Sequence, residues 1–321
     1  MVKIVELPNL LKKFFTVVKP DKLELGWWAG APTICKLDDH TFLLAVRMRE
    51  AVSPRGRRGY EIRILKSEDG IHFETIHQIK REDANVPVFE RPALIKAPDN
   101  NLWLFGCSEI DGLWGIWYLD PAVDATQLDP KTLKRIELPL PKHFEYTADE
   151  KKQDSTHHSA FNIQFKDPFI FIDESGVRHM FVIAFDRIER IYHYKSKNSL
   201  QWEICEPCPV MENSGWHNFF TRPSCVLPLS VGYLFVYEGS NIFWHDPVYN
   251  IATGLAYSPD LVSFTDLTPS SPLIQSSTPS EYRTWRYSHW IHHNNAIYVY
   301  FEAANSDGTN ETRVSIIQTK Y

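Results

Sequence analysis

Apolar residues along the chain gather in pairs of short runs, and a tight polar turn separates the two runs of each pair. The clearest pair covers residues 165–186, where the first run opens on Lys166-Asp167-Pro168 and the second ends on Asp186. Short apolar runs bounded by turn residues predict two antiparallel strands. The pattern returns in four more segments, at 30–47, 90–108, 221–238 and 286–302, the last of which lacks the proline. Such repetition predicts an array of similar β-units rather than a sandwich.

A second hairpin follows most of these pairs. It consists of a strand, a polar turn, an aromatic residue and a final strand, and it is most degenerate in the second repeat. These hairpins cover residues 60–76, 114–137, 192–204 and 254–266. Four strands in each unit, with units of about 55–75 residues, predict an all-β fold, a five-bladed β-propeller with four antiparallel strands per blade. We expect one domain over residues 1–321, with blades at roughly 27–80, 87–140, 161–206, 217–270 and 284–321, the last closed with the N-terminal segment.

Composition narrows the class of protein. The chain has 321 residues, of which 43% are hydrophobic, so it can bury a large core and disorder is not expected. The formal net charge of -6, without a long basic run, argues against nucleic acid as a partner. No apolar run reaches transmembrane length, and the charged Lys3 and Glu6 make the start of the chain unlike a signal peptide. We therefore expect a cytoplasmic protein without a membrane partner.

The lengths of the connections predict which end of the propeller carries the site. Turns between the first two strands of a repeat are short, as at 38–40 and 293–295, whereas connections at the other end are long, as at 141–165 and 240–250. Long loops on a rigid scaffold carry function more often than tight turns do. At that end the first strand begins and the second strand ends, so residues from both positions should meet in one funnel. The first strands contribute Ala31, Arg91, Asp167, Arg222 and Arg286, and the second strands contribute Arg47, Ser108 with Glu109, Asp186, Glu238 and Glu302.

Acidic residues in this predicted funnel suggest acid/base chemistry on a sugar. Two carboxyl groups that face each other across a pocket can act as general acid and general base in cleaving a glycosidic bond. The candidates, in order, are Asp167, Glu238, Glu302, Asp186 and Glu90. The alternative is a ring of ion pairs that closes the channel, with Glu238 and Glu302 each bound to the arginine of its own blade.

Basic and aromatic residues near the same loops suit the binding of a sugar. Arginines can hold a phosphate or a uronate carboxylate in bidentate fashion, and they lower the pKa of a neighbouring carboxyl group. The predicted substrate-binding residues are Arg91, Arg222, Arg286, Arg47, His217, His289, Trp28 and Trp216. We expect no required cofactor and no protein-bound transition metal, and a calcium or sodium ion on the propeller axis is compatible with this interpretation.

The repeats resemble those of the five-bladed propeller glycosidases, the group that contains glycoside hydrolase families 43, 32, 117 and 130. Lys166-Asp-Pro-Phe-Ile-Phe-Ile-Asp-Glu-Ser-Gly176 resembles the Asp-Pro strand and Asp-Gly turn of family 43. Ser67–Phe73 and Ser258–Phe264 resemble the outer-strand turn shared across these families. The resemblance extends from Trp27 to Ile317 and implies a hydrolase that cleaves short oligosaccharides with inversion. Inversion in turn implies two carboxyl groups about 6.5–9.5 Å apart.

Two departures from the family patterns leave other functions open. Families 43 and 32 carry a catalytic aspartate in the first blade where this chain has Gly30-Ala31-Pro32, and family 130 has Glu-Asp-Pro-Arg where this chain has Glu90-Arg91-Pro92. One alternative is a phosphorylase like those of family 130. In it phosphate would lie among Arg91, Arg222, Arg286 and His217. The other alternative is a propeller that binds carbohydrate without catalysis, which the missing first-blade aspartate allows.

Overall fold

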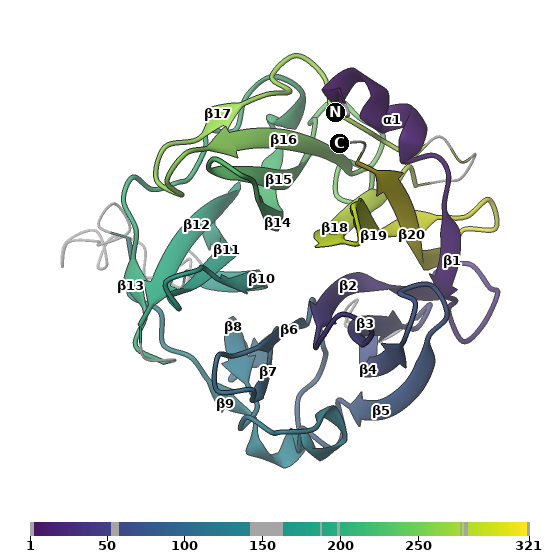
Figure 1. The fold of residues 1–321 in the computed structure, drawn as a ribbon, viewed down its shortest axis with the longest axis vertical. Coiled ribbons are helices and arrows are strands. Elements are labelled where there is room, and N and C mark those ends of the chain that lie inside the picture. Colours follow the sequence, from purple (N-terminus) through teal and green to yellow (C-terminus); the bar gives the residue numbers. More distant parts are fainter. Residues whose placement is uncertain are drawn as a thin grey trace.

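Blades of four strands stand around a common axis in the part of the chain that the structure describes (Figure 1). Three of the blades are separate four-stranded sheets, and the other two are joined into one eight-stranded sheet. The structure is a computed structural model. It describes residues 3–52, 58–141, 163–186, 188–197, 200–276, 278 and 282–319, with the main chain alone at 185 and 186. The arrangement confirms the predicted fold class, an all-β, five-bladed propeller with four antiparallel strands per blade.

Each blade runs from an inner strand at the axis to an outer strand at the rim (Figure 1). The first blade consists of β2 (Trp28–Lys36), β3 (Phe42–Arg49), β4 (Gly59–Ser67) and β5 (Glu74–Lys80). The second consists of β6 (Ala93–Lys96), β7 (Leu102–Ile110), β8 (Leu113–Tyr118) and β9 (Lys134–Arg135). The third consists of β10 (Gln164–Ile172), β11 (Arg178–Asp186), β12 (Ile188–Ser196) and β13 (Glu203–Ile204). The fourth consists of β14 (Phe220–Pro228), β15 (Tyr233–Ser240), β16 (Ala252–Ser258) and β17 (Thr265–Asp266).

The fifth blade takes its outer strand from the start of the chain. It consists of β18 (Trp285–His293), β19 (Ala296–Ala304), β20 (Asn310–Gln318) and β1 (Phe15–Val18), which pairs with β20. A single parallel bridge between Trp28 and Asn310 also joins β20 to β2 of the first blade. Pairing the two ends of the chain in one sheet closes the ring, and the termini lie close together (Figure 1).

Short helices occupy connections and the N-terminal segment. They are η1 (Ile4–Glu6), α1 (Leu7–Leu10), η3 (Ala125–Gln127), η4 (Pro130–Thr132) and η6 (Gly215–His217). Within the described ranges, no helix is long and apolar enough to cross a membrane.

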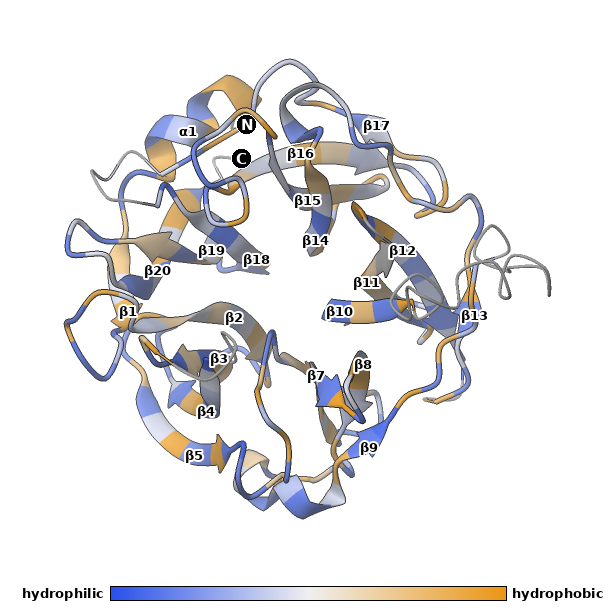
Figure 2. Ribbon diagram, turned by 180° about the vertical axis from the view of Figure 1, so that it is seen from behind, coloured by the Kyte–Doolittle hydropathy of each residue, from blue (hydrophilic) through white to orange (hydrophobic). Residues whose placement is uncertain are grey.

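Apolar side chains of neighbouring sheets pack against each other and form the core. Between the first and second blades, Leu43 and Ile64 pack with Phe89, Leu104 and Trp117, which are all at most 2% exposed. Similar clusters join other neighbouring blades. The outer strand β5 has both orange and blue stretches in Figure 2, and of its two isoleucines Ile79 is buried and Ile76 partly buried. Packing on both faces holds each sheet at a set angle to the axis and so determines where the inner strands end.

Four of the inner strands share an irregularity, which in three of them falls at or next to a proline. The pairing register shifts between Gly30 and Thr33 in β2, and at corresponding places in β10, β14 and β18. Proline has no N–H for the ladder, so strands tolerate it at bulges. In three of these bulges one residue has a left-handed φ, which is 51° at Ala31, 51° at Asp167 and 52° at Tyr287. These three residues therefore hold equivalent positions in their blades.

Candidate active site

Hydrogen bonds between inner strands lock the blades together near the axis. Thr33 Oγ1 of the first blade donates to the Pro92 carbonyl at 2.6 Å, and Ser224 Oγ of the fourth donates to the Ser288 carbonyl at 2.9 Å. The main-chain N–H of Ile34 donates to His289 Nδ1 at 3.2 Å. Burial, together with the charge of Arg91, lowers the pKa of His289 to about 3. His289 is thus a neutral link between the fifth and first blades.

A buried network of ion pairs joins the first and fifth blades. Glu302 on β19 accepts hydrogen bonds from Arg286 Nε at 3.1 Å and Nη2 at 2.8 Å, and Arg47 Nη2 lies 3.4 Å from its other oxygen. Arg47 also forms an ion pair with Glu90. Burial raises the pKa of Glu302, but Arg286 and Arg47 outweigh it and lower the value to about 2. The ion pair of Glu302 with the arginine of its own blade, which sequence analysis offered as the alternative to catalysis, is present.

Glu90 has a similar environment. Burial raises the pKa of its carboxyl group, and Arg47 followed by Arg49 lowers it to about 2. Both Glu90 and Glu302 are therefore ionised partners of arginines near neutral pH. A group that ionises so readily is a poor general acid, because it holds no proton to donate.

Two further arginines are held by groups of the protein. Arg91 is fully buried and reaches from the second blade to the fourth, where Nη1 donates to the Pro223 carbonyl at 2.6 Å and Nη2 donates to the Ser224 carbonyl. Arg222 on β14 donates from Nε to Glu189 of the third blade at 2.5 Å. The ion-pair alternative expected Arg222 to pair with Glu238. Its described contacts join it to Glu189 instead. Arg91 thus joins two blades that are not neighbours and Arg222 joins two neighbouring blades, and donors of both are used in these contacts.

The carboxyl groups of Asp167 and Glu238 are connected by Tyr287. The Tyr287 hydroxyl donates to Asp167 Oδ2 at 2.9 Å, and the Tyr287 main-chain N–H donates to Glu238 Oε1. Asp167 also contacts Cys107, because its N–H lies 3.2 Å from Sγ and its Oδ1 lies 3.5 Å from the same atom. Glu238 is 0% exposed, and its Oε2 has no hydrogen-bond partner among the described residues. A buried oxygen without a partner calls for an explanation, and a substrate is one.

The electrostatics of Glu238 differ from those of the other glutamates in the cluster. Burial raises the pKa of Glu238 to about 7, against the opposing effect of Arg91, the Tyr287 N–H, Arg286 and Arg222. A carboxyl group that keeps its proton near neutral pH can donate it to a leaving group. Glu238 is therefore suited to the role of general acid.

The structure places Asp186 and the fifth-blade counterpart of Asp167 differently from the sequence-based expectation. Asp186 is the last residue of β11 and pairs with Ile188 of β12, and its side chain lies outside the described residues. In the register, Ile183 stands opposite Lys166 just as Arg47 stands opposite Gly30, so the second-strand position in the third blade is apolar. In the fifth blade the counterpart of Asp167 is Tyr287, so aligning Arg286 with Asp167 was wrong. Tyr287 could have been found by aligning Ser288 with the prolines of the other repeats.

His217 and Trp216 belong to the outer part of the fourth blade. His217 Nε2 lies 3.2 Å from Asp266 Oδ2, and Trp216 Nε1 donates to the Thr268 carbonyl at 2.7 Å. Trp216 also stacks on Tyr237, with ring centroids 5.8 Å apart. Both side chains are thus engaged in packing and polar contacts within the blade. Their described contacts do not join them to the axial arginines.

Trp28 is buried near the axial network rather than displayed for stacking. It is 1% exposed, and its Nε1 donates to the Gly308 carbonyl at 3.3 Å. The guanidinium groups of Arg49 and Arg286 lie 4.5 Å and 5.3 Å from its ring. Such cation–π contacts favour a role in holding arginines in place.

The described residues contain no group of three or more His, Cys, Asp and Glu side chains that could hold a metal ion. Of the carboxyl groups near the axis, those of Glu90 and Glu302 form ion pairs with arginines.

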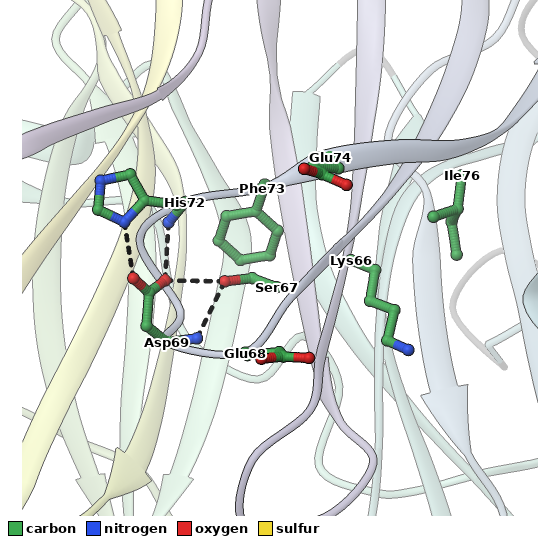
Figure 3. A pocket seen from close by; sticks show the side chains of 8 residues that line it. All are labelled: Lys66, Ser67, Glu68, Asp69, His72, Phe73, Glu74 and Ile76. Atoms are coloured by element: carbon green, nitrogen blue, oxygen red, sulfur yellow. Dashed lines mark hydrogen bonds and ion pairs between the residues drawn. The ribbon is translucent and has the colours of Figure 1, made fainter.

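A surface hollow of about 820 Å³ lies away from the axis, at the outer turn of the first blade (Figure 3). In it Ser67 and His72 both hydrogen-bond Asp69. The fourth blade repeats the main-chain contacts of this turn, since Asp260 Oδ1 accepts from the N–H of Val262 and Ser263 at 2.9 and 2.8 Å, as Asp69 does from Ile71 and His72. Repetition in a second blade indicates a structural turn rather than a site.

Comparison with known proteins identified solved structures of similar fold. No family model matches the sequence, and no curated protein matches it significantly. A structure described as an RGII complex covers 100% of this chain and 97% of its own, with a TM-score of 0.67 and 15% identity. A thermostable family-43 glycoside hydrolase covers 93% of this chain and 91% of its own, with a TM-score of 0.62 and 12% identity.

A third match comes from family 130, described as a family of mannoside phosphorylases that contains glycoside hydrolases targeting β-1,2 mannosidic linkages in Candida mannan. It covers 94% of both chains, with a TM-score of 0.59 and 12% identity. The fold is that of the five-bladed propeller glycosidases. The resemblance inferred from the repeats is thereby confirmed for the fold over the full chain.

Proposed function

We propose that this protein is a glycoside hydrolase that cleaves short oligosaccharides, with Glu238 as the general acid and Asp167 as the second carboxyl group. The observation that carries the proposal is the environment of Glu238, which is buried, retains a proton near neutral pH and has an oxygen without a described partner. Matches to proteins described as glycoside hydrolases support the same class of reaction.

In the proposed reaction Glu238 Oε2 donates its proton to the glycosidic oxygen as the bond to the leaving sugar breaks. In the inverting course that the family resemblance implies, Asp167 accepts a proton from the water that attacks the anomeric carbon. Asp167 stands in the third blade, so in this proposal it performs work that families 43 and 32 assign to a first-blade aspartate. In this chain Ala31 occupies the first-blade position, and its N–H donates to Glu302 at 3.0 Å.

The two alternatives have less support. Of the residues expected around phosphate in a phosphorylase, Arg91 binds carbonyl oxygens, Arg286 binds Glu302 and His217 contacts Asp266. A propeller that binds carbohydrate without catalysis would not need a protonated carboxyl group at its axis. Both alternatives are outcomes of the experiment that follows.

The test is a screen of aryl glycosides and oligosaccharides, with and without inorganic phosphate. It compares the wild type with Glu238→Gln, Asp167→Asn and the control Asp120→Asn, which removes a surface partner of Lys134. We expect phosphate-independent cleavage, slowed about 10²–10⁴-fold by Glu238→Gln on oligosaccharides and much less on aryl glycosides whose leaving group needs no proton. Asp167→Asn should slow both substrates.

Each other result assigns a different function. Turnover only with phosphate would establish a phosphorylase. Binding of oligosaccharides without turnover would establish the non-catalytic propeller. Turnover that survives Glu238→Gln on every substrate would remove Glu238 from the mechanism. Following the anomer of the first product by NMR would test inversion.

A further inference from the structure

Tyr287 contacts both carboxyl groups of the proposed pair through different atoms. Its hydroxyl donates to Asp167 Oδ2 at 2.9 Å, and its main-chain N–H donates to Glu238 Oε1. Asp167 lies in the third blade and Glu238 in the fourth, whereas Tyr287 comes from the fifth. One residue therefore spans the three blades on which the pair depends.

The main chain at Tyr287 is strained. Its φ of 52° lies in the left-handed region, which a bulky side chain rarely adopts. Such conformations persist where the surrounding structure imposes them, and they are frequent at functional sites. Here the strained φ belongs to the bulge that aims both the N–H of Tyr287 and its ring toward the axis.

Arginines surround the Tyr287 ring. The guanidinium carbon of Arg286 lies 4.9 Å from the ring centroid, and those of Arg47 and Arg91 each lie 5.5 Å from it. The residue itself is 3% exposed. Packing and cation–π attraction therefore restrict the ring to one orientation, in which its hydroxyl meets Asp167.

We propose that Tyr287 is the positioning residue of the acid/base pair. Its main-chain N–H orients Glu238 so that Oε2 faces the substrate, and its hydroxyl holds the Asp167 carboxyl group at a set distance from Glu238. This inference deepens the proposed function and rests on it. It assigns to the fifth blade a part of the site that no sequence motif indicated.

The substitution Tyr287→Phe separates the two contacts. It removes the hydroxyl donor of Asp167 and leaves the main-chain donor of Glu238 in place. Tyr300→Phe is the matched control, because Tyr300 is a fully buried tyrosine of the same blade whose hydroxyl donates to the Gly70 carbonyl at 2.8 Å, away from the pair. Both variants lose one buried phenolic hydrogen bond.

The first readout separates kcat from KM on the best substrate of the screen. With Tyr287→Phe we expect kcat to fall about tenfold to a hundredfold, since the hydrogen bond that positions Asp167 is lost, with KM nearly unchanged. The basic limb of the pH profile of kcat/KM, which follows Glu238, should stay in place, because the main-chain donor of Glu238 remains. Tyr300→Phe should change neither kcat nor this limb.

The second readout needs no substrate and separates failure of this inference from failure of the proposed function. It is the urea midpoint of unfolding of Tyr287→Phe and of Tyr300→Phe, each measured in the wild-type background and in an Asp167→Ala background. The lowering caused by Tyr287→Phe should be smaller in the Asp167→Ala background, because the acceptor of the Tyr287 hydroxyl is already gone. The lowering caused by Tyr300→Phe should be the same in both backgrounds, because its hydroxyl donates to the Gly70 carbonyl.

The inference is overturned if Tyr287→Phe behaves like Tyr300→Phe in both readouts. If no substrate is cleaved but the effect of Tyr287→Phe on the unfolding midpoint depends on Asp167 as expected, the proposed function fails while the contact between the two residues stands. If cleavage occurs and kcat does not fall, Tyr287 has only a packing role.

Discussion

The protonation state of Glu238 can be measured through folding stability, without any substrate. Burial raises its pKa from 4.5 to about 7. One pKa unit corresponds to about 1.36 kcal/mol, so the difference between the folded and unfolded chains is about 3 kcal/mol. Between these two values the folded protein keeps a proton that the unfolded chain has released, and the stability that this proton provides is therefore lost as the pH rises.

The perturbation is Glu238→Gln, which imitates the protonated side chain and cannot ionise. At about pH 5 the variant should be nearly as stable as the wild type. At about pH 8 the wild type carries a buried charge and the variant does not. The free energy of unfolding of the variant minus that of the wild type should therefore rise by about 2–3 kcal/mol between pH 5 and pH 8. The assay is urea unfolding followed by tryptophan fluorescence at both pH values.

Glu302→Gln is the matched control, because Glu302 has a pKa lowered from 4.5 to about 2. Its ionised form contributes stability above pH 4.5 that is lost only as the pH falls toward 2. The free energy of unfolding of this variant should be lower than that of the wild type by about 3–5 kcal/mol throughout pH 5 to 8, because the substitution leaves Arg286 and Arg47 without their buried anion. If the stability difference for Glu238→Gln were the same at both pH values, Glu238 would be ionised throughout and unsuited to act as the acid.

Two further predictions concern the framework of the site. Gly30→Ala should lower the free energy of unfolding by about 2–4 kcal/mol, because a Cβ there would collide with the Glu302 carboxylate. Gly176→Ala is the control. Its Cβ would meet nothing within 4 Å, and the φ of 82° alone should lower the free energy of unfolding by about 1 kcal/mol. Equal losses in urea unfolding would contradict the close packing of Gly30. Arg91→Lys should lower the free energy of unfolding by about 1–3 kcal/mol, since one ammonium group cannot bridge two carbonyls as the guanidinium does. The control is Arg135→Lys at a more exposed arginine, and an equal or larger loss of stability there would refute the role of Arg91 in joining two blades.

Most of what could be predicted about the fold and the site came from local sequence patterns. Apolar runs, prolines and turns repeat within short stretches, and the physical reasons for them, alternation of strand faces and the backbone needs of turns, act within a few residues. The five-bladed fold and the gathering of Arg47, Asp167, Glu238 and Glu302 near the axis followed from that repetition. The pairing of Glu302 with Arg286 was foreseeable too, because the two residues stand opposite each other in adjacent strands.

Contacts between blades were decided by the tertiary structure. Arg222 meets Glu189 of another blade, Arg91 meets carbonyl groups of the fourth blade, and Tyr287 reaches both Asp167 and Glu238. These partners lie far apart in the sequence, and each contact depends on the bulge register of an inner strand and on the angle between blades. A pattern of apolar and polar positions says which side of a strand is buried. It does not say which of several buried charges will meet, and that choice determined that Glu238 keeps its proton while Glu302 gives its proton up.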